Sequence, residues 1–275
     1  FIIIHRWKMS EIDKSILEVA KEVAVPFYND ALSPVSREVG KGLESVARMA
    51  NAGIFLAEDC VQALTSVLRM TGQQLLCLPP ERVSVERPRV AAKVIEEARY
   101  AIEEPEVQQM FASLLSAAMD KERANLVHPA YVEVIRQLDP DEAKILKFMH
   151  HLGGKAPTLK FTRSSQPKNG LDREEMFSMT METEHVNLIC EDSGCTYVEN
   201  ESIYLANLKR LDLITGVASN SFVEFDVHTR IKESVKIEQI KQQNPHINIY
   251  SYSNSMYVFT RFGHALVKAC FPEES

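Results

Sequence analysis

His128 is the histidine whose sequence neighbours most resemble an acid–base site, because the carboxylates Asp120 and Glu122 lie close to it. Catalysis by a histidine needs an imidazole near its ordinary pKa and a partner that orients the ring. His128 directly precedes Pro129, however, where a polar side chain satisfies the first N–H groups of a helix. We therefore expect His128 to cap a helix, and we assign no catalytic residue to the chain.

A second group of side chains, His185, Cys190 and Cys195, is of the type that binds zinc. Structural zinc needs four ligands, commonly in pairs two to four residues apart. The three residues are loosely spaced and a fourth ligand would have to come from elsewhere, so we predict no metal site and no cofactor. The adjacent His150 and His151 are expected to end a helix, where an imidazolium interacts favourably with the helix dipole.

Lys209 and Arg210 are the residues best placed to contact nucleic acid, since both would face outward on a predicted helix. Such side chains reach phosphates or guanine edges in a groove. Acidic residues surround the pair, namely Glu199, Glu201 and Asp212. From Asp139 onward the chain holds 15 lysines and arginines against 19 aspartates and glutamates, which argues against strong duplex binding. We predict protein docking, with nucleic-acid binding as the alternative.

The composition is that of a soluble globular protein, with 45% hydrophobic and 25% charged residues among 275. The net charge of −7 argues against a protein that coats nucleic acid non-specifically, although it allows local basic patches. No apolar run approaches the roughly 20 residues of a membrane-spanning helix, and five scattered cysteines predict free thiols in a reducing cytoplasm. The chain lacks a phosphate-binding glycine loop, Gly-x-Ser-x-Gly, His-Glu-x-x-His and paired Cys-x-x-Cys motifs. We therefore expect that the protein is not an enzyme.

The elements that must position these residues are clearest between Glu104 and Gly154. Three prolines stand where helices would begin, because proline suits the first helical position: Pro105, Pro129 and Pro140. After each proline the apolar residues fall on one helical stripe. Asp139 and Glu142 predict a capping box, and Gly153-Gly154 predicts the end of that helix.

Further helices are predicted over Ser10–Val25, after Pro34 and after Pro88, with Leu78–Val83 as an extended linker. The run Ala50–Ala57 is apolar all round, which predicts burial between helices; a membrane-inserting hairpin is the alternative. Residues 1–8 precede Met9, the expected start, so we expect them to be upstream or added residues. A short interfacial anchor is the other interpretation of residues 1–8.

The C-terminal half has a mixed pattern. Residues 155–169 are predicted to be a loop, followed by a helix at Tyr204–Leu213 with a strand at Leu213–Thr215, a strand at Val223–Val227, a helix at Ile231–Gln243, a β-hairpin from Ile247–Tyr252 and Met256–Phe259, and a last helix at Phe262–Cys270. This order is that of a winged-helix module. We predict a mainly α fold: a helical domain over residues 9–138, then a winged-helix-like α+β domain over residues 139–275.

Several segments resemble the Abi-alpha family of bacterial abortive-infection proteins. The matching segments are VSREVGKGL (Val35–Leu43), LPPERV (Leu78–Val83), EEARYAIEEPEVQQMFASLLSAAMD (Glu96–Asp120) and VHPAYVEVIRQLDPDEAKIL (Val127–Leu146), with shorter matches at Asn207–Leu211 and Phe259–Gly263. The Val127–Leu146 match is the most specific. The resemblance implies a role in phage defence and implies no established catalytic residues.

Together these observations predict a cytoplasmic anti-phage defence protein that acts non-enzymatically, through a host or phage protein partner or through self-association as an oligomer. The alternatives are a winged-helix DNA-binding regulator that uses Lys209 and Arg210, and a membrane-active effector that uses Ala50–Ala57. A membrane partner and a small-molecule substrate are not expected.

Overall fold

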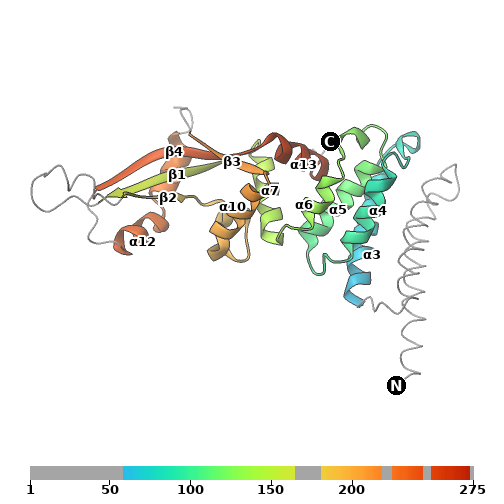
Figure 1. The fold of residues 1–275 in the computed structure, drawn as a ribbon, viewed down its shortest axis with the longest axis horizontal. Coiled ribbons are helices and arrows are strands. Elements are labelled where there is room, and N and C mark those ends of the chain that lie inside the picture. Colours follow the sequence, from blue (N-terminus) through green and yellow to red (C-terminus); the bar gives the residue numbers. More distant parts are fainter. Residues whose placement is uncertain (1–57, 165–180, 219–224, 244–248, 273–275) are drawn as a thin grey trace, which may run out of the picture. The chain divides into compact units, whose positions relative to one another are not determined.

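The computed structural model describes residues 58–164, 181–218, 225–243 and 249–272. These residues divide into two compact units: unit 1 holds 58–143 and 265–272, and unit 2 holds the described part of 144–264. The division falls within α7 (Pro140–His151) and α13 (Arg261–Cys270), so each of these helices contributes residues to both units. Figure 1 traces the elements in chain order. The predictions for residues 1–8, Ser10–Val25 and Ala50–Ala57 lie outside the described residues.

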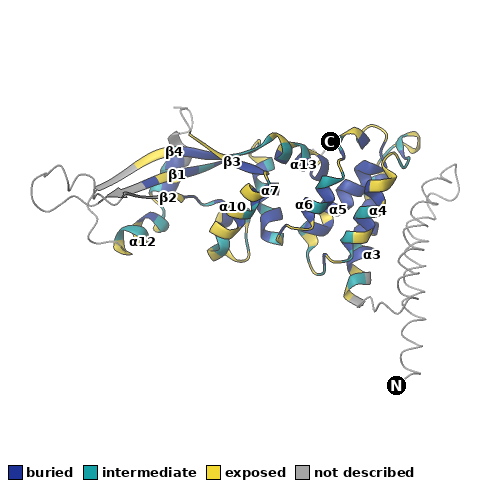
Figure 2. Ribbon diagram, viewed as in Figure 1, coloured by how far each residue is buried: buried dark blue, intermediate teal, exposed yellow. Residues whose placement is uncertain are grey.

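Unit 1 is built around α5 (Pro105–Ala118). This helix packs against α3 (Glu58–Leu76), α4 (Pro88–Ala98) and α6 (Ala130–Ile135). From residue 110 to residue 118 every side chain of α5 is buried, and the helix is dark blue along this stretch in Figure 2. The prediction of a single apolar stripe was therefore too narrow. Small residues, Ala112, Ser113 and Ser116, complete the circumference, and their size lets neighbouring helices approach closely.

Short 3-10 turns connect the helices of unit 1: η1 (Pro80–Arg82) after α3, and η2 (Ala124–Leu126) after α5. The predicted extended linker at Leu78–Val83 thus contains a helical turn. Pro79 and Val83 on either side of the turn have extended backbone angles. No helix in the described part of the chain is long and apolar enough to cross a membrane.

The proline-started helices are confirmed. α4, α5 and α7 begin at Pro88, Pro105 and Pro140, and α6 follows Pro129, which occupies its N-cap.

Both ends of α7 have the geometry that the sequence predicts. The backbone N–H of Asp139 donates to Glu142 Oε2 at 2.9 Å, and the N–H of Asp141 donates to Asp139 Oδ1 at 2.9 Å. At the other end, Gly154 N–H donates to the carbonyl of Met149 (2.8 Å), and Gly153 N–H donates to that of His150 (3.0 Å). Both glycines have positive φ, +71° and +83°. This is the Schellman arrangement, which favours glycine because L side chains are strained there.

Unit 2 contains a four-stranded antiparallel sheet in the order β2-β1-β4-β3. The strands are β1 (Lys155–Ser164), β2 (Met181–Val186), β3 (Ile214–Ala218) and β4 (Ile249–Phe259). The helices of this unit are α9 (Ile189–Ser193), α10 (Glu201–Arg210), α11 (Phe225–Lys232) and α12 (Val235–Gln243), with the 3-10 turn η3 (Val198–Asn200) before α10. The chain is therefore mostly helical, with a small sheet in its C-terminal part.

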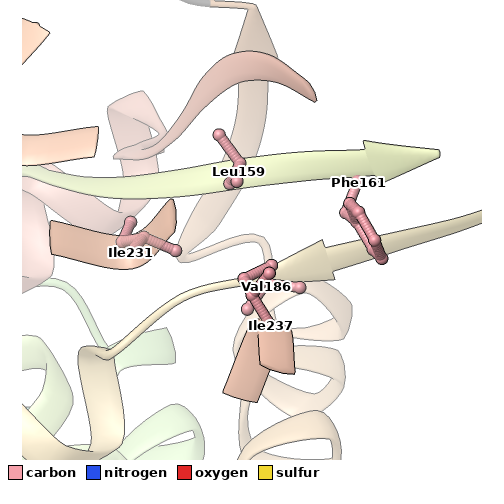
Figure 3. Close-up of a cluster of buried hydrophobic side chains, with 5 residues drawn as sticks. All are labelled: Leu159, Phe161, Val186, Ile231 and Ile237. Atoms are coloured by element: carbon pink, nitrogen blue, oxygen red, sulfur yellow. The ribbon is translucent and has the colours of Figure 1, made fainter. Parts of the chain in front are cut away.

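One face of the sheet forms a hydrophobic core with α11 and α12. Leu159 and Phe161 of β1 and Val186 of β2 pack against Ile231 of α11 and Ile237 of α12 (Figure 3). All five side chains are almost completely buried. Because successive side chains of a strand point to opposite faces, the intervening residues of β1 and β2 lie on the other face.

Three predictions for unit 2 were wrong. The segment predicted to be a hairpin at residues 247–259 contains one continuous strand, β4, which pairs with β1 on one side and with β3 on the other. The predicted strand Val223–Val227 is helical from Phe225 onward, as part of α11. The predicted helix Ile231–Gln243 is two helices: α11 ends at Lys232 and α12 begins at Val235, and between them the Ser234 hydroxyl donates to the carbonyl of Ile231 (2.6 Å).

The predicted loop over 155–169 was also wrong, since residues 155–164 form β1. Pro157 suggested a loop because a proline cannot donate to a strand ladder. In the structure, Pro157 lies where β1 pairs only with β4, since the pairing with β2 begins at Leu159. β1 is an edge strand at that point and accommodates the proline. The predicted helix ending near Leu213, the strand that follows it and the last helix are confirmed as α10, β3 and α13.

Candidate functional site

The predicted nucleic-acid contacts, Lys209 and Arg210, form the last turn of α10, and both are exposed. The ammonium of Lys209 donates to the hydroxyl of Tyr257 at 3.2 Å and lies 4.5 Å from the centroid of that ring. Lys209 therefore lies along the sheet, with its charge over β4. Arg210 donates from Nε and Nη2 to Asn207 Oδ1 at 3.0 and 2.7 Å, so its guanidinium lies beside its own helix.

The outer side of α10, which faces away from the interior of unit 2, also carries an exposed apolar side chain. Tyr204, Leu205 and Leu208 face the interior of unit 2, whereas Ile203 is 64% exposed. Tyr197, just before η3, is 57% exposed. Large apolar groups exposed close together in the sequence are characteristic of binding surfaces when they form a patch.

A network of ion pairs holds α9, α10 and α12 together. Lys236 of α12 donates to Glu201 Oε2 at 2.5 Å and to Glu191 Oε1 at 2.8 Å. It also donates to the carbonyl of Asn187 (2.9 Å), whose amide in turn donates to Glu201 Oε1 (2.8 Å). Burial acts to lower the pKa of Lys236, but its bonds to Glu191 and Glu201 outweigh burial and hold that pKa above its usual value. The network fixes the start of α10 within unit 2.

The residues considered as zinc ligands have other surroundings. His185 is exposed at the end of β2, Cys190 is buried in α9, and Cys195 contacts the hydroxyl of Ser193 at 3.3 Å. Burial and the neighbouring Cys195 raise the pKa of the Cys190 thiol well above its usual range. Among the described residues, no three His, Cys, Asp or Glu side chains converge as metal ligands would.

His128 takes the capping role that the sequence predicts. Its Nδ1 accepts the backbone N–H of Ala130 at 3.1 Å, and its carbonyl accepts that of Tyr131 at 3.0 Å. Nδ1 is thus the unprotonated nitrogen of the ring in this arrangement. The side chain satisfies one of the first N–H groups of α6.

In unit 1 a bidentate ion pair between Arg82 and Asp120 joins η1 to the residues that follow α5. Arg82 donates from Nε to Asp120 Oδ1 at 3.1 Å and from Nη2 to Oδ2 at 2.6 Å, and its Nη1 lies 2.8 Å from Glu122 Oε2. Burial acts to raise the pKa of Asp120, but hydrogen bonds from Arg82 and from the N–H of Glu122 lower it below its usual value. Backbone bonds run beside the pair, from Ser84 to Met119 and from Lys121 to Arg82.

Sequence reasoning did not predict this pair, although both partners lie in segments that resemble one family. Arg82 belongs to Leu78–Val83, and Asp120 ends Glu96–Asp120. Their opposite charges in two separately matching segments were the available signal. One of the two short C-terminal matches, Phe259–Gly263, bonds to the residues that directly follow the other: Thr260 N–H donates to the carbonyl of Leu213 (3.0 Å), and the Thr260 hydroxyl donates to that of Asp212.

These features define a mostly helical protein with a small antiparallel sheet, in which polar contacts also join segments distant in sequence. The chain belongs to the Abortive infection alpha family, whose model matches residues 62–270. A comparison with curated proteins gave no match. Among solved structures, an uncharacterized protein from the hydrocarbon-degrading marine bacterium Alcanivorax borkumensis SK2 is similar, with 14% identity and a TM-score of 0.34 over 54% of this chain and 94% of that one.

Proposed function

We propose that the protein acts in abortive infection as a non-enzymatic binding protein, whose unit 2 docks a protein partner through the outer side of α10. The family supports the defence role. The observation that carries the docking role is Ile203, which is 64% exposed in the first turn of α10. An aliphatic side chain there gains free energy when a partner covers it, whereas it offers nothing to a phosphate backbone.

We further propose that unit 2 is a winged-helix module with additions. The chain order α7, β1, α9, α10, β3, β4 supports this, as does the adjacency β1-β4-β3 within the sheet. In this scheme α10 occupies the position of the recognition helix, and the wing consists of β3 and β4. β2 and the pair α11–α12 are the additions. Winged helices serve in protein docking as well as in DNA binding, and the recognition helix is the docking element in this proposal.

The test is phage protection by the full-length chain in bacteria. Ile203→Asp places a charge on the proposed docking side without touching the interior, so we expect protection to be lost while the helical circular dichroism is unchanged. Ser202→Asp is the matched control, because Ser202 is exposed on the same helix about 100° away. Equal protection by the parent and by Ile203→Asp would sink the proposal.

Self-association is part of the same proposal, since a second copy of the chain can be the partner. Sedimentation equilibrium of the purified chain distinguishes the two cases. If a second copy docks on α10, the parent is an oligomer and Ile203→Asp is a monomer. If the partner is a host or phage protein, both are monomers, and only the parent retains that protein in a pull-down from infected cells.

Duplex DNA binding by Lys209 and Arg210 is the second candidate, supported by the exposure of both side chains in the last turn of α10. Neutralising phosphates makes binding strongly salt-dependent. A DNA-binding regulator would therefore bind a duplex at low salt, with an affinity that falls steeply as salt rises. That binding would be lost in the Lys209→Ala/Arg210→Ala double variant.

A further inference from the structure

The sheet face opposite to α11 and α12 carries a pair of basic residues on neighbouring strands. Lys160 of β1 and His185 of β2 are direct cross-strand partners, and both are exposed. Side chains at such positions are about 5 Å apart at Cβ. Leu159 and Val186, their immediate neighbours, are buried against α11 and α12, so strand alternation places Lys160 and His185 on the other face.

Lys209 brings a second ammonium to this face from α10. Tyr257, on which Lys209 rests, pairs with Ala156 of β1, which lies on the same face as Lys160 because the two are four residues apart. The rings of Tyr257 and His185 are 6.3 Å apart between centroids. Tyr257 is only 2% exposed, so it acts as a fixed support that holds the ammonium of Lys209 towards His185.

The charges of Lys209 and Lys160 both disfavour the protonated form of His185. Burial lowers the pKa of His185 below its usual value, and the charges of Lys209 and then Lys160 lower it further. Among the described residues, those two lysines are the charged groups that act on this imidazole. Like charges placed across a strand pair are destabilising, and an anion bound between them would relieve that cost.

We propose that Lys160, His185 and Lys209 bind a phosphate group on this face of the sheet. Two ammonium groups, and the His185 imidazolium that a bound anion favours, supply charged N–H donors to the oxygens of a phosphate. The phosphate is that of a nucleotide or of a nucleic-acid backbone. The site lies on the sheet, uses none of the apolar residues of the proposed docking surface, and goes beyond the proposed function.

The experiment follows the His185 imidazole of the full-length chain by NMR, with its signal assigned by its loss in His185→Gln. Three probes are titrated at constant ionic strength: inorganic phosphate, adenosine monophosphate and a short single-stranded DNA. We expect a saturable shift of the His185 signal and a rise of its pKa with at least one probe, because an adjacent anion favours the imidazolium. Tighter binding of the mononucleotide or of the DNA identifies the source of the phosphate. No saturable shift with any probe overturns the proposal.

Matched variants separate a built site from general charge attraction. Lys160→Gln should weaken phosphate binding by about threefold, as expected for loss of one partly exposed charge. Lys155→Gln is the control, since Lys155 is exposed on the same strand but on the opposite face, and it should bind as the parent does. Sodium acetate at equal ionic strength should leave the His185 pKa unchanged. Equal weakening by both lysine variants, or an equal effect of acetate, contradicts the proposal.

Discussion

At the scale of single residues, Gly263 is the described glycine at which an added Cβ has the least room. An added Cβ would lie 2.0 Å from the carbonyl oxygen of Leu213, and the atom in the way is backbone, which cannot rotate aside. Close approach here brings the start of α13 against the start of β3. Gly263 lies in the matching segment Phe259–Gly263, and the backbone that it approaches at Leu213 follows the matching segment Asn207–Leu211 by two residues.

We therefore predict that Gly263→Ala destabilises the protein by about 2–3 kcal/mol, the upper part of the range for overpacking a well-packed site. Gly216→Ala is the matched control in the same unit, because its added Cβ would meet Tyr257 only at 3.7 Å, an ordinary contact. Urea unfolding followed by circular dichroism measures both variants. A Gly263→Ala midpoint equal to that of Gly216→Ala would show that the backbone moves aside without cost.

Residue types also explain which site residues the sequence could predict. The roles of His128, Asp139 and Glu142 are local, since each side chain bonds within three residues of itself, and sequence reasoning predicted all three. The partners of Lys209 and Arg82 lie 48 and 38 residues away. No local pattern reveals such pairs, because their formation depends on the register of a sheet or on the packing of helices.

At the scale of elements, the predicted and missed segments differ in how their boundaries arise. The helices that begin at Pro88, Pro105 and Pro140 carry their start signal in their own sequence, and the structure places them as predicted. β4 has no such signal: Ser253, Asn254 and Ser255 suggested a turn. Pairing of these residues with Lys160, Leu159 and Thr158 of β1 keeps the strand extended. The pairing of β4 with β1 therefore outweighs the local propensity of these three residues for a turn.

The Arg82–Asp120 ion pair makes the junction of η1 and α5 sensitive to acid. The pKa of Asp120 is lower in the folded chain than the unfolded value of about 3.9. A carboxylate of this kind contributes stability that is fully present above the unfolded pKa and is lost as pH falls through the folded pKa. We predict that Asp120→Asn is less stable than the parent at pH 7 and that the difference shrinks as the pH falls below about 4.

Thermal unfolding between pH 3 and pH 7 measures this effect. Glu86→Gln is the control, since Glu86 is an exposed carboxylate in the segment that follows η1. Its unfolding temperature should follow that of the parent at every pH. A difference between Asp120→Asn and the parent that stays constant over the whole range contradicts a titrating ion pair and would assign the loss to packing.

At the scale of the whole molecule, the chain passes between the two units within α7 and within α13. Unit 1 is an all-helical assembly in which α5 is surrounded, and unit 2 is a sheet with helices connected by ion pairs. The structure divides at residues 143/144, and the last helix adds residues 265–272 to unit 1. A contribution from the opposite end of the chain has no signature in composition or periodicity.

Two buried cysteines report on the two units separately. Cys190 lies in unit 2 and Cys270 in unit 1, and burial raises the pKa of Cys270 to about 12. Since the thiolate is the reactive form, both should resist N-ethylmaleimide in the folded protein, whereas the exposed Cys77 reacts at once. In rising urea, each cysteine becomes reactive when its own unit opens, and peptide mass spectrometry measures each one.

We predict that Asp120→Asn and Gly263→Ala each lower the urea concentration at which a different one of these two cysteines becomes reactive. Asp120→Asn removes a contact of unit 1, so modification of Cys270 should begin at lower urea while that of Cys190 changes less. Gly263→Ala disturbs the packing of unit 2 and should act first on Cys190. A single urea midpoint for both cysteines in every variant would mean that α7 and α13, which contribute residues to both units, transmit unfolding from one unit to the other. The two units would then form one cooperative structure, and a ligand bound to the sheet of unit 2 would stabilise the helices of unit 1 as well.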